Sequence, residues 1–364
     1  MFTVSCHKSH PPAAVAVPIT AMRVEPQTIP ADFEFIGVGE SSHIVQIRAR
    51  VEGYLESIDY KEGSLVKTGD LLFVLDQRPF IAAVESAQGM LDRQNAILWN
   101  AEQTKNRMVP LYQQNAVSQR DLDRALADQL AAAAEVETAK ADLYKAAINL
   151  GFTSIQAPVT GLSGQAKYRE GALISPGAGD ENLLTTLYVV DPIWVNFNIS
   201  DNELLQLKQD VAEKQVQLPK DMHFQIEAIL SDGTVVPTEG VIDFNNPAIQ
   251  QSTGTMLFRS VFPNPKISIY PGQFVKVIVK GAVRPGAIAV PQTALVQGGK
   301  GTFVYVVENG KALERMVVPG DWYKDFWIIN SGLKAGDIVV AIGVNKLQHE
   351  SPVAIQSMLS STLP

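Results

Sequence analysis

The chain has 364 residues, of which 46% are hydrophobic and 19% are charged, an ordinary composition for a folded protein of two or three domains. Its formal net charge of -8 argues against a nucleic-acid partner, because phosphate binding requires a basic surface. The sequence contains no apolar run of roughly 18 residues, so no segment is expected to span a membrane by itself.

The amino-terminal segment contains the single cysteine, Cys6, which excludes an internal disulfide. Bacterial lipoprotein signals end in small residues before a cysteine that becomes lipidated. Thr3 and Ser5 fit those positions, although the preceding apolar stretch is nearly absent. Cys6 is therefore either a lipid attachment site or a free thiol on a loose tail. With His7 and His10 it could also hold a soft metal ion, but we favour a polar, proline-bearing linker.

The next segments predict β-strands. Residues 16–41 predict two strands, which need partners from β segments later in the chain. In residues 44–76 apolar side chains recur at every second position, and glycines mark the turns. The stretch KEGSLVKTGDLLFVLD at 61–76 resembles one half of a lipoyl or biotinyl carrier domain. In such domains the modified lysine lies in the hairpin between two similar halves, and no such lysine follows here.

Residues 79–113 and 118–150 predict two long helices. Apolar residues recur there at alternating spacings of three and four, as in a coiled coil. A connection of about four residues predicts an antiparallel hairpin, and four alanines at 131–134 allow a close approach of the backbones. At ~1.5 Å per residue the hairpin extends about 50 Å. It is therefore expected to project into solvent or to meet partners.

After the second helix the strand pattern returns, and it repeats the earlier strand segment at an offset of 108 residues. The pattern A-x-V-x-G at 49–53 recurs at 157–161, and Lys-Glu-Gly at 61–63 recurs as Arg-Glu-Gly at 169–171. The register fails only where AGDEN is inserted. The missing half of the carrier-like domain is thus expected beyond the helical hairpin.

The remaining chain predicts two further β regions. Residues 188–280 contain several short strands with glycine and proline punctuation, which suggests a small barrel, and a short polar helix near 201–214. Residues 284–356 form a last β unit, in which Glu-Asn-Gly at 308–310 is a hairpin turn signal.

No motif of an enzyme is present. Phosphate-binding, dinucleotide, zinc-protease and nucleophile-elbow motifs are absent, and the histidines lack ligand spacing outside the tail. We therefore predict neither catalytic residues nor a cofactor. At the connection between the helices, Ser118 and Asp121 predict a capping box that begins the second helix. Arg107 and Leu111 share one helix face, and Pro110 should kink the first helix.

Together these features resemble the periplasmic adaptor (membrane fusion) proteins of tripartite efflux pumps of the RND type. The resemblance covers nearly the whole chain. It rests on the split carrier-like halves, the inserted hairpin and four further segments: DPIWVNF (191–197), YPGQFVKV (270–277), VPQTAL (290–295) and GLKAGDIVV (332–340).

The resemblance implies a site at the hairpin tip. In this family an Arg, a Leu four residues later and a Ser seven residues further dock the outer-membrane channel, and Arg107, Leu111 and Ser118 have these spacings. It also implies an inner-membrane RND-type transporter and an outer-membrane channel of the TolC type as partners, and self-association into a ring, expected to be a hexamer. Lipidation at Cys6 would anchor the chain to the inner membrane, in the periplasm.

The implied fold class is mostly β and multidomain, with a long antiparallel coiled-coil hairpin and nested domains. The expected parts are an N-terminal tail or lipid anchor (1–12), a membrane-proximal β domain (13–36 and 284–356), a β-barrel (37–48 and 188–283), a lipoyl-like domain (49–78 and 153–187), the α-helical hairpin (79–152) and a C-terminal tail (357–364).

Three alternatives remain open at the level of the sequence. Within the family, the chain could serve an ATP-driven exporter, or a metal-efflux pump that uses Cys6, His7 and His10. From another class, it could be a lipoyl or biotinyl carrier subunit, but the residues between the two halves are helical, and Lys67 precedes the last strand of its half.

Overall fold

A computed structural model describes residues 16–177, 182–299 and 301–360. The tail with Cys6, His7 and His10 lies outside the described residues. The chain divides into two compact units. The first comprises Met1–Gly37, Asn196–Ser260 and Val275–Pro364, and the second comprises Val38–Val195 and Val261–Phe274.

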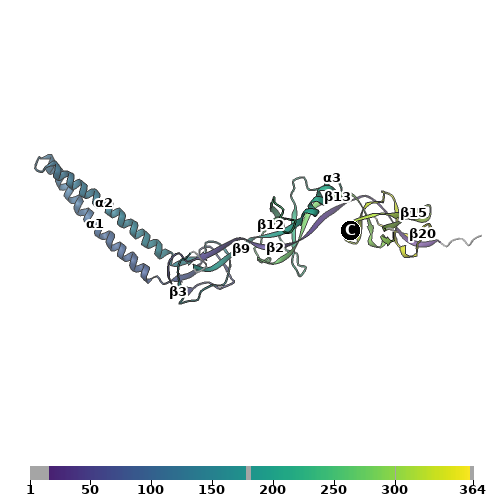
Figure 1. Cartoon of the computed structure of the whole chain (residues 1–364), viewed down its shortest axis with the longest axis horizontal. Helices are drawn as coiled ribbons and strands as arrows, with labels where there is room; N and C mark the ends of the chain where they lie inside the picture. Colours follow the sequence, from purple (N-terminus) through teal and green to yellow (C-terminus); the bar gives the residue numbers. More distant parts are fainter. Residues whose placement is uncertain (1–15, 178–181, 300, 361–364) are drawn as a thin grey trace, which may run out of the picture. The chain divides into compact units, whose positions relative to one another are not determined.

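The second unit contains two long helices, α1 (Arg78–Gln113) and α2 (Gln119–Gly151). Their ends lie within one residue of the predicted limits, and α1 continues through Pro110 for three more residues. The two helices run side by side (Figure 1). We call α1, α2 and the connecting residues 114–118 the helix pair.

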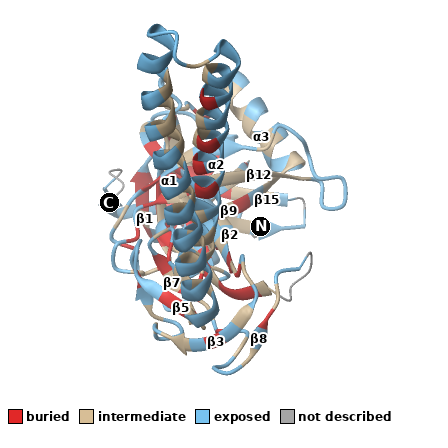
Figure 2. Ribbon diagram, turned by 90° about the vertical axis from the view of Figure 1, so that its left-hand side faces the viewer, coloured by how far each residue is buried: buried red, intermediate tan, exposed pale blue. Residues whose placement is uncertain are grey.

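Small side chains on α2 form the buried contact of the helix pair. The buried residues of α2 are Ala125, Ala132, Val136 and Ala139, and α1 buries none of its described residues. The spacings of seven, four and three keep the four on one face of the helix (Figure 2). Because alanine extends only to Cβ, two backbones can approach closely along this face. Most of the remaining surface of the helix pair stays exposed to solvent.

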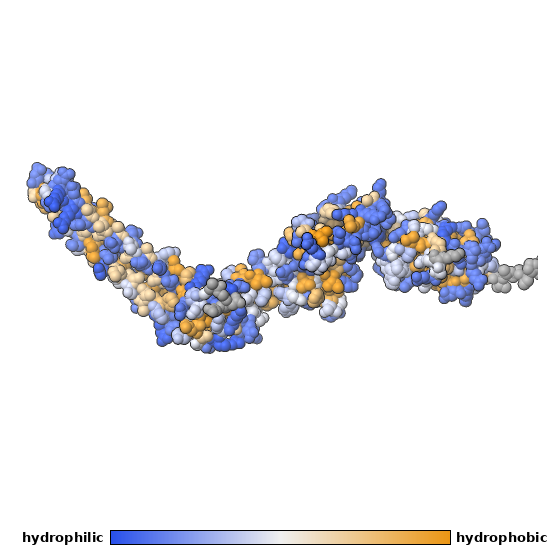
Figure 3. Space-filling model, viewed as in Figure 1, coloured by the Kyte–Doolittle hydropathy of each residue, from blue (hydrophilic) through white to orange (hydrophobic). Residues whose placement is uncertain are grey.

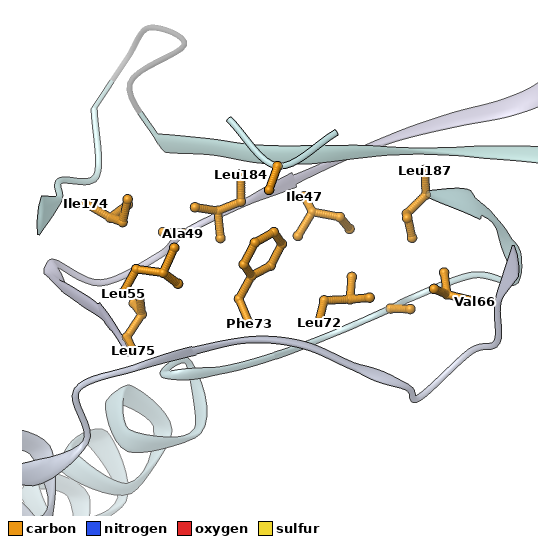
Figure 4. Close-up of a cluster of buried hydrophobic side chains, with 12 residues drawn as sticks. Ile47, Ala49, Leu55, Val66, Leu72, Phe73, Leu75, Ile174, Leu184 and Leu187 are labelled. Carbon is orange, nitrogen blue, oxygen red and sulfur yellow. The ribbon is translucent and has the colours of Figure 1, made fainter. Parts of the chain in front are cut away.

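At the base of the helix pair lies a small β core built from both halves of the repeat. Buried Phe73 lies among leucines and isoleucines from both halves, including Leu55, Ile174 and Leu184 (Figure 4). The six strands are β3 (Gly53–Ile58), β4 (Leu65–Val66), β5 (Leu71–Leu75), β6 (Ser154–Gln156), β7 (Gly161–Ser163) and β8 (Leu173–Ile174).

Reciprocal hydrogen bonds confirm the 108-residue repeat. The N–H of Gly63 donates to the carbonyl of Ser163 over 3.1 Å. The equivalent N–H of Gly171 donates to the carbonyl of Leu55, which is the equivalent of Ser163, over 2.8 Å. Gly63 and Gly171 have φ of 77° and 85°, the left-handed conformation that favours glycine. Each half of the repeat thus donates an equivalent backbone hydrogen bond to the other half.

The glutamates of the repeated Lys/Arg-Glu-Gly motif form a second equivalent pair of hydrogen bonds between the two halves. Glu62 Oε1 accepts a hydrogen bond from the N–H of Ala166 over 3.0 Å. Glu170 Oε1 accepts the equivalent bond from the N–H of Ile58 over 3.3 Å. Of these two glutamates, only Glu62 also forms an ion pair within the described residues, with Arg169 at 2.9 Å. A glutamate of each half therefore accepts a hydrogen bond from a backbone N–H of the other half.

The first unit contains a β-barrel. Each strand is hydrogen-bonded to the next, and β2 closes the ring by pairing with both β13 and β9. In ring order the strands are β2 (Gln27–Arg48), β13 (Phe274–Pro291), β10 (Gln225–Ile229), β11 (Gly240–Asn245), β12 (Thr255–Phe262) and β9 (Leu183–Ser200).

Two barrel strands are longer than predicted. For residues 188–280 the sequence indicated several short strands, whereas β9 and β13 have 18 residues each; β2, outside that range, has 22. Each contains an internal proline (Pro30, Pro192 or Pro285), which is typical of a strand boundary. A strand continues through proline where the missing N–H is not needed in the ladder.

A short helix, α3 (Asp201–Ala212), follows β9 and ends two residues before its predicted limit. Ser200 and Glu203 form a capping box at its start.

The last β region is a second closed ring, formed by β15, β16, β20, β1 and β19. Strand β1 pairs antiparallel with β19 and parallel with β20, so the N-terminal strand finds partners near the C-terminus. Asn309 and Gly310 have φ of 51° and 76°, which confirms the predicted hairpin turn. The elements are β1 (Val17–Arg23), η2 (Gln292–Ala294), β14 (Val296–Gly298), β15 (Gly301–Glu308), β16 (Lys311–Met316), β17 (Val318–Tyr323), β18 (Phe326–Ser331), β19 (Ile338–Ile342), η3 (Val344–Lys346) and β20 (Ser351–Leu359).

Candidate functional site

The candidate site is the end of the helix pair, residues 107–121, which we call the tip. Helix α1 ends there in a Schellman motif. The N–H of Ala116 donates to the carbonyl of Leu111, and the N–H of Asn115 donates to the carbonyl of Tyr112, both over 2.9 Å. Asn115 has φ of 52°, the left-handed conformation that asparagine tolerates better than most residues. The reversal of the chain is therefore held by backbone hydrogen bonds.

Ser118 begins α2 through the predicted capping box, which the structure confirms. Its hydroxyl accepts a hydrogen bond from the N–H of Asp121 over 3.3 Å and donates to Oδ2 of the same residue over 2.6 Å. The Asp121 carboxylate also accepts from the N–H of Ser118 over 3.3 Å. These bonds satisfy N–H groups that have no partner within the helix. The side chain of Ser118 is nevertheless exposed.

Arg107 and Leu111 lie one turn apart in the last part of α1, and both are exposed. The Arg107 guanidinium makes a long contact of 3.5 Å with the hydroxyl of Thr104. The side chain of Leu111 is 39% exposed, which is unusual for leucine. In the part of the chain that the structure describes, no hydrogen bond joins Arg107, Leu111 and Ser118 to one another. The structure places all three on the tip and leaves them accessible.

The tip carries charges of both signs. The hydrogen bond from Ser118 is the main cause that lowers the pKa of the Asp121 carboxyl, and Arg120 and Arg124 lower it further. Asp121 is therefore ionised at neutral pH and favourably placed at the positive end of α2. The outer end of the helix pair is predominantly polar (Figure 3). A rigid, polar end with one exposed leucine is suited to docking against another protein.

The described part of the chain offers neither a metal site nor a membrane-spanning helix. Among residues 16–177, 182–299 and 301–360, no three His, Cys, Asp or Glu side chains gather as metal ligands would. Within the same ranges, no helix is both long and apolar enough to cross a membrane.

Sequence reasoning missed Asn115, whose left-handed conformation fixes the turn at the tip. The Gln-Gln-Asn-Ala stretch at 113–116 contains the signal, since asparagine is a common residue at this position of a helix end. Sequence reasoning also missed an apolar cavity in the barrel. Its walls come from segments distributed along most of the chain, and no local pattern marks them.

The fold and the site define a multidomain β protein that presents a pair of long helices for interaction. Comparison with known families identifies it further. Residues 43–186 match "RND MFP, barrel-sandwich hybrid domain", residues 192–283 match "RND MFPs, beta-barrel domain", and residues 286–346 match "RND MFPs, C-terminal permuted SH3 domain". The chain belongs to the RND membrane fusion protein (MFP) family.

Similar proteins cover almost the same length. The chain is 34% identical over 331 residues to the efflux pump periplasmic linker BepD of Brucella suis biovar 1 (strain 1330), covering 91% of this chain and 83% of that protein. It is 32% identical over 345 residues to the multidrug efflux pump subunit AcrA of Escherichia coli (strain K12), covering 94% and 86%.

Among solved structures, MacA from Actinobacillus actinomycetemcomitans has the same fold. Its TM-score to this chain is 0.58 at 21% identity, and the match covers 88% of this chain and 99% of MacA.

Proposed function

We propose that this protein is the periplasmic adaptor subunit of a tripartite drug-efflux pump, which links an inner-membrane RND-type transporter to an outer-membrane channel of the TolC type. The observation that carries the proposal is the run of three successive RND MFP domain matches between residues 43 and 346. Relatives at 32–34% identity are named as an efflux pump linker and a multidrug efflux pump subunit. In this role the protein performs no bond chemistry.

The proposed architecture is nested, with the domain boundaries expected from the sequence. Two observations support it: β1 pairs with β19 and β20, and the helix pair lies between the two halves of the lipoyl-like core. In this arrangement the helix pair is an antiparallel coiled-coil hairpin that projects toward the outer membrane.

Arg107, Leu111 and Ser118 are proposed to contact the channel, because all three are exposed on the tip. Arg107→Asp reverses a charge and should weaken assembly at least about tenfold, or 1.4 kcal/mol. Ser118→Asp is the sharper test, because aspartate is as good an N-cap as serine. It therefore alters the contact surface and keeps an oxygen that can accept from the N–H of Asp121, while it loses the hydroxyl that donates to the Asp121 carboxylate.

Both variants should abolish drug efflux in cells that depend on this adaptor, with helix content and thermal unfolding unchanged. Arg93→Asp is the matched control, since Arg93 is also exposed on α1 but lies 14 residues before Arg107. Unchanged drug tolerance in both tip variants would contradict the docking role.

Ring formation is proposed through the sides of the helix pair, with six copies. Large apolar side chains are exposed there: Trp99 is 64% exposed, Leu130 66% and Tyr144 70%. Exposed apolar surface of this kind marks protein interaction sites. Cross-linking through cysteines placed at such positions, followed by mass determination, would give the number of copies.

Lipidation of Cys6 is proposed as the anchor to the inner membrane. Mass spectrometry of the mature N-terminus of the wild-type protein and of Cys6→Ser would detect it. An unmodified thiol in the membrane-derived wild-type protein would exclude this anchor.

Membrane cross-linking followed by identification of the partners tests the function as a whole. Recovery of an RND transporter supports it, whereas recovery of an ATPase exporter alone would favour the adaptor of an ATP-driven pump. A carrier subunit gains no support, because the helix pair stands where the hairpin with the modified lysine would be. A lipoyl or biotinyl adduct in the intact mass would revive it. The metal-efflux alternative rests on the tail with His7 and His10, and loss of Cu(I) binding in His7→Ala/His10→Ala would favour it.

A further inference from the structure

Helix α1 contains a proline close to its end, and the helix continues past it. Pro110 lies inside α1, which runs on through Gln113. In an α-helix the N–H of each residue donates to the carbonyl four residues earlier, and proline has no N–H. The carbonyl of Asn106 therefore lacks the donor that an interior carbonyl of a helix normally has.

The proline is not needed to end the helix. The backbone N–H groups of residues 114–116 donate to the carbonyls of residues 110–112 over 2.9 to 3.2 Å. The Schellman motif at Asn115 thus terminates α1 by itself. Proline is by far the least favourable residue in the interior of a helix. At position 110 it therefore lowers the stability of α1, although the helix end does not require it.

The carbonyl of Asn106 lies on the solvent side of α1. A helical carbonyl points along the axis toward the residue four positions later, and both Asn106 and Pro110 are exposed. A proline ring crowds this carbonyl, and carbonyls on the solvent side of a helix tilt outward. No group outside α1 in residues 16–177, 182–299 and 301–360 donates to this oxygen. It is thus an accessible hydrogen-bond acceptor.

This oxygen lies beside two of the residues that are proposed to contact the channel. Asn106 and Pro110 are one turn apart, as are Arg107 and Leu111, so the two pairs occupy neighbouring rows on the exposed surface of α1. The Arg107 guanidinium contacts the hydroxyl of Thr104, three residues earlier, and so lies away from Pro110. Side-chain contacts and a backbone acceptor are therefore presented on one surface.

We propose that the carbonyl of Asn106 belongs to the docking site and accepts a hydrogen bond from a donor side chain of the outer-membrane channel. The proposal rests on the adaptor function proposed above and adds a backbone contact to it. A carbonyl without a helical partner is solvated in the free protein, so docking replaces water and breaks no hydrogen bond of the chain. Pro110 is the positioning residue, because it keeps this oxygen free of a helical donor.

The test restores the missing N–H. Pro110→Ala lets residue 110 donate to the carbonyl of Asn106, so hydrogen exchange in residues 107–113 should slow. Docking should weaken at least about threefold, because one hydrogen bond to the channel is lost. Docking is measured by titrating the full chain against the detergent-purified TolC-type channel that membrane cross-linking recovers. Unchanged or tighter docking would overturn the proposal.

Two further variants separate the acceptor from the proline ring. Pro110→Val keeps an apolar side chain but has an N–H, and should weaken docking as much as Pro110→Ala. An ester at position 110, introduced as an α-hydroxy acid with the side chain of alanine, has no N–H and should restore docking to within about twofold of wild type. Retained docking in Pro110→Val, or no recovery with the ester, would assign the effect to the ring or to a helix kink and overturn the proposal.

Gly89→Ala is the matched control, because it also replaces an unfavourable helix residue of α1 but lies outside the tip. Nothing lies within 4 Å of a Cβ at Gly89. The variant should stabilise α1 and leave docking unchanged. Weakened docking in Gly89→Ala would show that a more stable helix impairs docking by itself, and it would remove the argument for the carbonyl.

Arg107→Asp separates this proposal from the adaptor function. Lost docking in Arg107→Asp together with unchanged docking in Pro110→Ala would overturn the carbonyl contact alone. Unchanged docking in both variants would contradict docking through the tip altogether.

Discussion

The helix pair and the small β core at its base belong to the same unit but are stabilised in different ways. The core encloses Phe73, Leu72 and Leu75 completely, and each half of the repeat donates backbone hydrogen bonds to the other. In the helix pair, only four small or medium-sized residues of α2 are buried among those described, and large apolar side chains such as Leu130 remain at the surface.

This difference shows which apolar surfaces the chain buries within itself and which it leaves exposed. Apolar burial is the main favourable contribution to folding, and the core obtains it within one chain. The helix pair leaves much of its apolar surface uncovered, as is typical of a surface that meets another protein. Substitutions in the core should therefore change stability, and substitutions on the helix pair should change assembly.

The largest expected effect is in the core. Phe73→Ala removes a fully buried ring and should lower the free energy of unfolding by about 3–5 kcal/mol, measured by denaturant titration with circular dichroism. Leu130→Ala, at an exposed position of α2, should change it by no more than about 0.5 kcal/mol. Equal losses of stability would show that the helix pair is stabilised like the core.

Two glycine-to-alanine substitutions should change the stability of the protein in opposite directions. In the core, a Cβ at Gly161 would lie 2.6 Å from the carbonyl oxygen of Tyr188, so Gly161→Ala should destabilise by about 1–3 kcal/mol. In α1, nothing lies within 4 Å of a Cβ at Gly89, so Gly89→Ala should stabilise the helix by about 0.5–1 kcal/mol. Thermal unfolding should occur at a lower temperature in Gly161→Ala and at a higher temperature in Gly89→Ala than in the wild type. A shift in the same direction in both variants would contradict the proposed difference between the core and the helix pair.

At the tip, Ser118→Ala removes the cap of α2 and should cost about 1 kcal/mol. Hydrogen exchange of the N–H of Asp121 should quicken, because its side-chain acceptor is lost and only the carbonyl of Ser118 remains as a partner. Ser118→Asp should restore protection. If the aspartate variant exchanged as fast as the alanine variant, the cap would not be the cause.

The smallest effect depends on pH. The N–H of Ala166 is the main cause that lowers the pKa of Glu62, and Arg169 contributes. Because the folded pKa lies below the ordinary value of about 4.3, the stabilisation is full above that value and is lost as the pH falls through the folded pKa. Glu62→Gln should therefore melt slightly below wild type at pH 7 and converge with it in acid.

Glu170→Gln is the internal control for this experiment, since Glu170 accepts the equivalent backbone bond without an arginine partner. A difference between wild type and Glu62→Gln that stays constant from pH 7 to pH 3 would rule out the ionised carboxylate as its source.

Much of this fold could be predicted from local patterns. The heptad spacing located α1 and α2 to within one residue, and Ser118 with Asp121 predicted the cap. The pairing of Lys-Glu-Gly with Arg-Glu-Gly predicted two equivalent halves, which the exchanged hydrogen bonds of Gly63 and Gly171 confirm. Strand lengths were less predictable, because Pro30 or Pro192 ends a strand in one context and is tolerated in another.

The sequence by itself determined the helix pair, its cap and the existence of a divided β domain, because periodicity, capping and turn chemistry act over a few residues or recur at a fixed offset. Only the tertiary structure decided which strands close each ring, that β1 lies between β19 and β20, and that Phe35, Phe197 and Phe258 line one cavity. Those contacts join residues far apart in the chain. Their geometry depends on how complete strands pair, and no short stretch of sequence contains that information.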